Sequence, residues 1–158
     1  MKHIKAINSF IECEFFALRS SKNSENHQGV TNIIDLEPTI NRVDFIILSN
    51  PTFLHGKYLK ILINYDKPIF IEKPPLCSLS EIEIISKKIK NQNIKTYVAC
   101  NMRFNSSIIF LKNKLNINKI NEINIYAGSY LPDWRPNKDF RAIYSSQKKM
   151  GGGVHLDL

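Results

Sequence analysis

Short apolar runs of strand length alternate with stretches of helical periodicity along most of this chain. The strand candidates are residues 13–18, 31–36, 44–48, 67–71 and 94–99, and the helical stretches between and around them are residues 3–11, 37–42, 53–62, 79–89 and 105–115. Strands that alternate with helices pair in parallel, because each crossover to a parallel neighbour needs a helix. The pattern therefore predicts an α/β protein with a doubly wound parallel sheet.

One strand candidate, residues 67–71, ends directly at Glu72 and Lys73, which two prolines follow. A buried strand that ends this way places a carboxylate and an ammonium at the carboxyl edge of the sheet, where open α/β sheets bind ligands. The preceding strand candidate ends at Ser49-Asn50-Pro51 and reaches the same edge. Glu-Lys-Pro alone is a weak signal, since a charged turn before proline is as often a solvated loop.

Composition narrows the class of protein. A chain of 158 residues with 43% hydrophobic residues is long enough for one domain with a proper core and short for two. No apolar stretch approaches the roughly 20 residues of a membrane span, and no signal-peptide core follows Met1, so we expect a cytoplasmic protein. The three cysteines lie far apart and indicate neither a metal site nor a disulfide framework.

The net charge of +8 would fit a nucleic-acid or membrane-surface partner. The lysines are dispersed, however, and form no basic helix or aromatic-basic stripe, so we expect no nucleic acid and no membrane among the partners. The same charge suits an anionic small molecule such as a dinucleotide or a nucleotide-linked sugar.

Several motifs occur in a characteristic order. They are Asn50-Pro51-Thr52 followed by His55, Glu72-Lys73-Pro74-Pro75, Asn101-Met102-Arg103-Phe104 and the glycine run leading to Asp157. In these residues the chain resembles the glucose-fructose oxidoreductase / inositol dehydrogenase family (Gfo/Idh/MocA) of NAD(P)-dependent sugar oxidoreductases. The resemblance covers nearly the whole chain, and its order and spacing are more specific than any one motif.

The main departure from that family is the lack of a Gly-x-Gly-x-x-Gly turn. We expect the chain to start within the helix that this turn would open, and the first strand and glycine loop to be missing from a Rossmann-like domain over residues 1–103. Residues 104–158 then begin a second α/β domain, with a half-buried strand predicted by the alternation over residues 120–127. We expect a chain truncated at both ends, whether as a fragment, through a misplaced start codon, or as a decayed gene.

The predicted cofactor is NADP or NAD. Arg19 and Ser20 end the first strand candidate where a carboxylate would bind a free ribose 2′-hydroxyl, and a guanidinium with a hydroxyl suits a 2′-phosphate instead, which favours NADP. An ordinary exposed basic loop is the alternative. The resemblance implies further cofactor contacts, with structural roles as the alternative for His55 and Asn101. These residues are Asn50, Pro51, His55, Glu72, Lys73 and Asn101.

The predicted catalytic residues are Lys73, which would exchange the hydroxyl proton of the substrate, and Asp157, which the resemblance places against a sugar hydroxyl. Arg103, Trp134 and Arg135 are candidate substrate contacts, with ion-pair or surface-packing roles as the alternative. The glycine run 151–153 has no strand before it and is interpreted as a close-packed loop, and His155 as structural.

The resulting hypothesis is an NAD(P)-dependent oxidoreductase that acts on a hydroxyl or keto group of a sugar, cyclitol or nucleotide-sugar. The family implies a homo-oligomeric full-length form and makes polysaccharide biosynthesis a reasonable setting. The alternative is a non-catalytic, decayed or regulatory fragment that retains the fold. We expect the 158 residues alone to be inactive.

Overall fold

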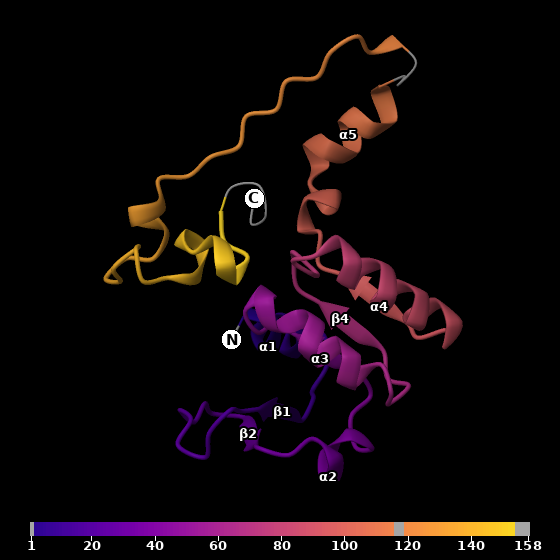
Figure 1. The fold of residues 1–158 in the computed structure, drawn as a ribbon, viewed down its shortest axis with the longest axis vertical. Helices are drawn as coiled ribbons and strands as arrows, with labels where there is room; N and C mark the ends of the chain where they lie inside the picture. Colours follow the sequence, from indigo (N-terminus) through magenta and orange to yellow (C-terminus); the bar gives the residue numbers. More distant parts are fainter. Residues whose placement is uncertain (1, 116–118, 154–158) are drawn as a thin grey trace. The chain divides into compact units, whose positions relative to one another are not determined.

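The computed structural model describes residues 2–115 and 119–153 of the chain, which forms two compact units, Met1–Val43 and Asp44–Leu158 (Figure 1). All strand pairing is parallel and falls into a two-stranded sheet, β1-β2, and a three-stranded sheet, β3-β4-β5. The alternation of strands and helices therefore gives the Rossmann-like α/β fold predicted from the sequence. The predicted domain boundary after residue 103 stays a prediction.

The first unit contains α1 (Lys2–Asn8), β1 (Phe15–Leu18), β2 (Val30–Ile33) and α2 (Glu37–Ile40). Helix α1 ends at Asn8, whereas the predicted helix extended to Ile11. Phe10 and Ile11 are exposed, so a longer helix would bury no further apolar side chain. In its described part, only Thr39 and Ile40 of α2 are buried. This unit has a small core.

The second unit begins with β3 (Ile46–Leu48), a 3₁₀ turn η1 (Thr52–Leu54), α3 (His55–Leu62), β4 (Ile69–Ile71), α4 (Leu79–Asn91) and β5 (Thr96–Val98). Ile46 lies beside Ile69, which lies beside Thr96, so each crossover moves one strand along in the same direction. Right-handed crossovers then place α3 and α4 on the same face of the sheet, where the two helices contact each other.

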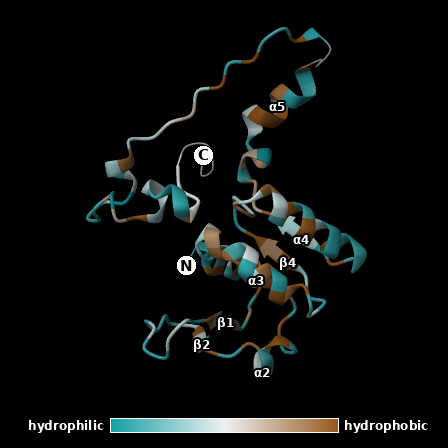
Figure 2. Cartoon of the chain, viewed as in Figure 1, coloured by the Kyte–Doolittle hydropathy of each residue, from teal (hydrophilic) through white to brown (hydrophobic). Residues whose placement is uncertain are grey.

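The main hydrophobic core lies in this second unit, and Figure 2 shows its central strand β4 as apolar. The buried apolar residues from the strands and helices are Leu48, Ile69, Ile71, Leu59, Leu62 and Ile85, and Ile63, directly after α3, is buried with them. Phe70, between the two buried isoleucines, points to the opposite face because side chains alternate along a strand. There it stacks on Tyr97 at 5.7 Å between ring centroids.

After β5 the chain forms η2 (Asn101–Phe104) and α5 (Ser106–Lys114). The Asn105 side chain caps α5 by accepting hydrogen bonds from the backbone N–H groups of Ser107 and Ile108. The apolar residues at the middle of α5, which are brown in Figure 2, are exposed. Turns η4 (Leu131–Trp134), η5 (Tyr144–Ser146) and η6 (Lys148–Met150) follow.

The strand predicted over residues 120–127 is wrong. This segment is extended, but no strand of the described structure pairs with it, and Ile123 and Ile125 are exposed. An alternating pattern defines an apolar face, whereas a strand also needs a hydrogen-bonded neighbour. Across residues 2–115 and 119–153, no helix has the length and apolarity that crossing a bilayer would require.

Candidate functional site

The carboxyl ends of β3, β4 and β5 meet at one edge of the sheet, because the strands are parallel. We call the loops that leave this edge, residues 49–51, 72–77 and 99–101, the crest loops. The backbone N–H of Glu72 donates to the Leu48 carbonyl at 2.9 Å, and that of Ala99 donates to the Ile71 carbonyl at 2.8 Å. The ladder therefore continues into the crest loops and holds Glu72 beside the end of β3, as the sequence predicted.

His55 joins two of the crest loops. Its Nε2 atom lies 2.9 Å from the Asn50 carbonyl oxygen, and its Nδ1 atom lies 3.1 Å from the Pro75 carbonyl oxygen. The residue is the first of α3 and has no exposed surface. Both ring nitrogens are thus engaged by backbone, and His55 acts on the site through the loops that it holds.

Asn50 carries an unsatisfied acceptor. Its backbone carbonyl is bound by His55, while its side-chain Oδ1 is buried and has no hydrogen-bond partner. Leaving a buried acceptor unpaired costs about 1–3 kcal/mol, so such an atom is a strong indication of a missing donor. The crest after β3 therefore offers an acceptor to a ligand.

Glu72 and Lys73 extend from the end of β4. The Glu72 carboxylate turns back and accepts a hydrogen bond from the Lys73 backbone N–H at 3.2 Å, and the Lys73–Pro74 peptide bond is cis. Lys73 is exposed, whereas Glu72 is half-buried. The arrangement presents an ammonium group at the edge of the sheet.

The glycine run packs against the crest loops. A Cβ at Gly151 would lie 2.7 Å from the Cys77 Sγ and 3.4 Å from the Thr52 Cβ, and Gly151 has a φ of 83°. A Cβ at Gly152 would overlap the Tyr144 carbonyl. The prediction of a close-packed loop is therefore supported by its geometry. Asp157 and His155, which follow, lie outside the described residues.

Thr52 does not cap the helix after β3. The residue is buried at the start of η1, and α3 begins only at His55, after Leu54, without a side-chain cap. The 3₁₀ turn provides a hydrogen bond at the start of the helix instead, because the His55 backbone N–H donates to the Thr52 carbonyl.

Sequence reasoning missed two residues beside the crest loops, Cys77 and Glu81. Cys77 is exposed as a residue, but partial burial of its thiol raises the pKa, and the nearby negative charge of Glu81 raises it further. The Glu81 carboxylate lies so close to Gly56 that a Cβ there would be 2.5 Å from its Oε1, and it also pairs with Lys60 at 3.2 Å. Gly56 within a helical pattern was the available signal of a close approach.

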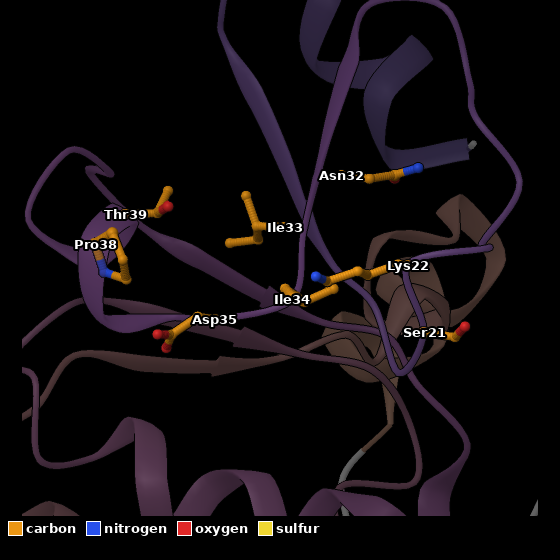
Figure 3. A pocket seen from close by; sticks show the side chains of 8 residues that line it. All are labelled: Ser21, Lys22, Asn32, Ile33, Ile34, Asp35, Pro38 and Thr39. Carbon is orange, nitrogen blue, oxygen red and sulfur yellow. The ribbon is translucent and has the colours of Figure 1, made fainter.

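The first unit has its own pocket, shown in Figure 3, at the ends of β1 and β2. Ser21 and Lys22 line it, and Figure 3 shows Lys22 beside Ile34, with Asp35 near Pro38. Of the residues predicted here, Arg19 is adjacent to the pocket and donates from Nε to the Asn32 Oδ1 at 2.7 Å. Ser20 is exposed, while the next two residues form the wall of the pocket.

The other predicted residues are less closely placed. Asn101 begins η2 and is exposed, and the Arg103 guanidinium lies over the Tyr97 ring at 5.8 Å. Trp134 ends η4 and Arg135 follows it, both with exposed surface. The functional roles of these residues stay predictions. In the described ranges, no three His, Cys, Asp or Glu side chains are grouped as a metal site requires.

The chain is similar to two characterised dehydrogenases. It is 27% identical over 115 residues to scyllo-inositol 2-dehydrogenase (NAD(+)) of Bacillus subtilis, a match that covers 73% of this chain and 32% of the relative. It is 28% identical over 125 residues to levoglucosan dehydrogenase of Pseudarthrobacter phenanthrenivorans, covering 79% of this chain and 31% of the relative. The chain thus spans about a third of the length of these relatives.

Solved structures show the same fold. The WlbA (WbpB) dehydrogenase from Thermus thermophilus, in complex with NAD and α-ketoglutarate, superposes with a TM-score of 0.59 at 19% identity, over 72% of this chain and 41% of that one. An NAD-binding protein from Listeria innocua gives a TM-score of 0.58 at 20% identity, over 82% of this chain and 38% of that one.

The model of one protein family, described as an oxidoreductase family with an NAD-binding Rossmann fold (GFO_IDH_MocA), matches residues 3–100. That match covers more than half of the chain and includes the crest loops after β3 and β4. The chain therefore belongs to the Gfo/Idh/MocA oxidoreductase family.

Proposed function

We propose that this chain is part of an NAD(P)-dependent oxidoreductase that acts on a hydroxyl or keto group of a sugar, cyclitol or nucleotide-sugar. One observation carries the proposal: the exposed Lys73 and the unsatisfied Asn50 Oδ1 lie on neighbouring crest loops that His55 holds together. The names of the relatives support the substrate class, since they are dehydrogenases of inositol and levoglucosan.

The residues at the crest fit a nicotinamide cofactor. The Asn50 Oδ1 needs a donor, and the carboxamide and ribose hydroxyls of such a cofactor are donors. Asn50 and Pro51 would hold it after β3, Glu72 after β4 and Asn101 after β5. A bound nicotinamide supplies hydride transfer to or from the substrate carbon.

The protein's own contribution is proton transfer and positioning. Lys73 would donate a proton to the substrate oxygen during reduction, or remove one during oxidation, from its exposed position beside the crest. Glu72 fixes the Lys73 backbone through the 3.2 Å hydrogen bond from its N–H. Asp157, with Arg103, Trp134 and Arg135, is proposed for substrate binding.

For the cofactor type we propose NADP over NAD. Lys22 and Ser21 line the pocket of the first unit with a positive charge and a hydroxyl donor, and Arg19 lies beside it, bonded to the pocket residue Asn32; an ammonium, a guanidinium and a hydroxyl suit a 2′-phosphate. Asp35 also lines the pocket and opposes this preference by its negative charge. The discrimination between the two cofactors is therefore expected to be moderate.

A second candidate is a non-catalytic protein that keeps the fold. Residues 1–158 contain no Gly-x-Gly-x-x-Gly turn, the element that supplies backbone N–H groups to the pyrophosphate in a Rossmann domain, so these residues by themselves do not provide that part of a cofactor site. In this case the crest would be intact but cofactor affinity would be lost.

Titration of the complete protein to which this chain belongs with NADPH and with NADH, followed by nicotinamide fluorescence, separates the two candidates. Saturable binding, followed by reduction of keto-sugars that is lost in Lys73→Ala, supports the oxidoreductase. Lys95→Ala is the matched control, since Lys95 is exposed just before β5, at the opposite end of the strands. Absence of binding by either cofactor supports the non-catalytic protein.

A further inference from the structure

Asn32 lies in the middle of β2 and lines the pocket of the first unit. Its side-chain amide bonds to segments on two sides. The Oδ1 atom accepts from the Arg19 Nε at 2.7 Å, and the Nδ2 atom donates to the Asn26 Oδ1 at 2.7 Å and to the Glu25 carbonyl at 3.2 Å. One amide therefore joins the residue that follows β1 to the loop that precedes β2.

These partners explain why an asparagine occupies a strand position. Asparagine is depleted in strands, so its presence in β2 needs a reason beyond local propensity. The Arg19 Nε–H can only donate and the Glu25 carbonyl can only accept, so the residue between them must offer an acceptor on one side and a donor on the other. A short side-chain amide meets both requirements.

The bond from Nε determines how the Arg19 guanidinium is held. The Arg19 backbone N–H donates to the Ile33 carbonyl at 2.8 Å, so both the main chain and the side chain of Arg19 are attached to β2. A guanidinium has five N–H groups, and the bond from Nε leaves the four on the terminal nitrogens outside it. Those four form the fork that binds a phosphate through two parallel hydrogen bonds. Orientation of this fork before binding lowers the entropy cost of holding an anion.

The same amide fastens the loop that carries Ser21 and Lys22, the two loop residues that line the pocket. Near the start of this loop the Ser24 hydroxyl donates to the Ser21 carbonyl at 2.7 Å, and near its end Asn32 bonds to Asn26. The position of the Lys22 backbone therefore also depends on Asn32.

Asp35 is the negatively charged residue of the pocket lining, and it is engaged elsewhere. Its Oδ1 accepts from the Glu37 backbone N–H at 3.2 Å, at the start of α2. Figure 3 shows Asp35 near Pro38 and apart from Asn32. The side of the pocket at Asn32 is therefore the one that suits an anion.

We propose that Asn32 is a positioning residue for cofactor specificity, which orients the Arg19 guanidinium and fastens the loop of Ser21 and Lys22 so that the pocket takes a 2′-phosphate. The inference rests on the proposed function, and in particular on its preference for NADP, and names the residue on which that preference depends. A purely structural asparagine would affect nucleotides with and without the 2′-phosphate equally. The decisive quantity is therefore a ratio of two affinities.

The test uses adenosine 2′,5′-bisphosphate and adenosine 5′-phosphate, which differ by the 2′-phosphate and carry no nicotinamide. Each is titrated calorimetrically into the complete protein to which this chain belongs. Asn32→Ala should weaken binding of the bisphosphate about fivefold and that of the monophosphate less than about twofold. Thr31→Ala is the matched control, since Thr31 is the exposed neighbour on the opposite face of β2, and should leave the ratio unchanged. Equal weakening of both nucleotides, or no preference for the bisphosphate in the unsubstituted protein, would overturn the proposal.

A double-variant cycle tests whether Asn32 acts through Arg19. In an Arg19→Ala background, Asn32→Ala should weaken binding of the bisphosphate less than about twofold, because the group that it orients is absent. A full loss of about fivefold in that background would contradict the proposed coupling.

The fastening of the loop is measured without any ligand. Hydrogen–deuterium exchange of the amides in residues 21–29 should be about fivefold faster in Asn32→Ala than in the unsubstituted protein, and unchanged in Thr31→Ala. Unchanged exchange in Asn32→Ala would contradict a positioning role.

Keto-sugar reduction keeps this proposal distinguishable from the proposed function. If Asn32→Ala removes the preference for the bisphosphate while the unsubstituted protein reduces no keto-sugar with either cofactor, the role of Asn32 stands and the oxidoreductase proposal fails. If reduction occurs and depends on Lys73 while the ratio is unchanged in Asn32→Ala, the role of Asn32 fails and the oxidoreductase proposal stands.

Discussion

Gly151 packs so tightly against Cys77 that a Cβ at position 151 would lie 2.7 Å from the Cys77 Sγ, closer than van der Waals contact permits. The two residues are far apart in the sequence, and their contact joins the glycine run to the crest loop after β4. Since Gly151 also has a φ of 83°, both its conformation and its surroundings favour glycine.

Gly151→Ala is therefore expected to lower the free energy of unfolding of the second unit by about 1–3 kcal/mol, through backbone strain and the overlap with the Cys77 sulfur. Denaturant unfolding measures the change. In a Cys77→Ala background the sulfur is absent and only the backbone strain at position 151 remains. Gly151→Ala should therefore lower the free energy of unfolding by less in that background. An equal loss of stability in both backgrounds would show that overlap with the sulfur does not contribute to the effect of Gly151→Ala.

The Cys77 thiol should react slowly with alkylating agents at mildly alkaline pH, because burial and the Glu81 charge raise its pKa and keep it protonated. Glu81→Gln removes one of the two causes and should increase the alkylation rate at pH 8, measured with Cys13 and Cys100 replaced by alanine. Because the thiol pKa is higher in the folded than in the unfolded protein, the thiol contributes to stability at lower pH. That contribution to stability is lost as the pH rises through the folded-state pKa. An unchanged rate in Glu81→Gln would exclude the charge as a cause.

Ile69→Ala should lower the free energy of unfolding by about 2–5 kcal/mol, because Ile69 is only 1% exposed at the centre of the three-stranded sheet. Ile125→Ala, at a position 87% exposed, should change it by less than about 0.5 kcal/mol. Ile69 belongs to an apolar run that forms a strand, and Ile125 to an alternating run that resembles one in sequence. Comparing the two variants therefore tests the finding that residues 120–127 form no paired strand. A large loss for Ile125→Ala would contradict it.

Lys22→Ala should weaken NADPH binding several-fold and leave NADH binding nearly unchanged, because only the former carries a 2′-phosphate for the Lys22 ammonium to neutralise. Lys5→Ala, on α1, removes the same charge away from the pocket lining and serves as the control. Equal weakening of both cofactors would argue against the proposed NADP preference. The comparison uses fluorescence titration at fixed ionic strength, since salt screens such contacts.

The sequence predicted the strands and helices well where local pattern and burial agree. The apolar runs around Ile46, Ile69 and Thr96 became the three parallel strands, and the change from an apolar run to Glu72-Lys73 marked the carboxyl edge of the sheet. The pattern over residues 120–127 failed because alternation carries no information about a pairing partner.

Contacts between distant segments were beyond the sequence. Nothing in the local pattern could show that Gly151 meets Cys77, or that His55 faces two carbonyl groups, because both depend on how loops fold over the sheet. The first unit shows the same limit: the basic stretch after β1 was recognised, but it is Lys22 that lines the pocket, while Arg19 is bonded to Asn32.

The order β3-β4-β5 has a consequence for how the crest forms during folding. Each strand pairs with its immediate successor in the sequence, so the loop-closure entropy of each step is that of a single short crossover. Asn50, His55 and Pro75 can therefore come together as soon as β4 has docked on β3, before β5 is in place. The His55 contacts with Asn50 and Pro75 are in this sense a local structure that can form early, and the glycine run reaches it only by a far longer loop closure.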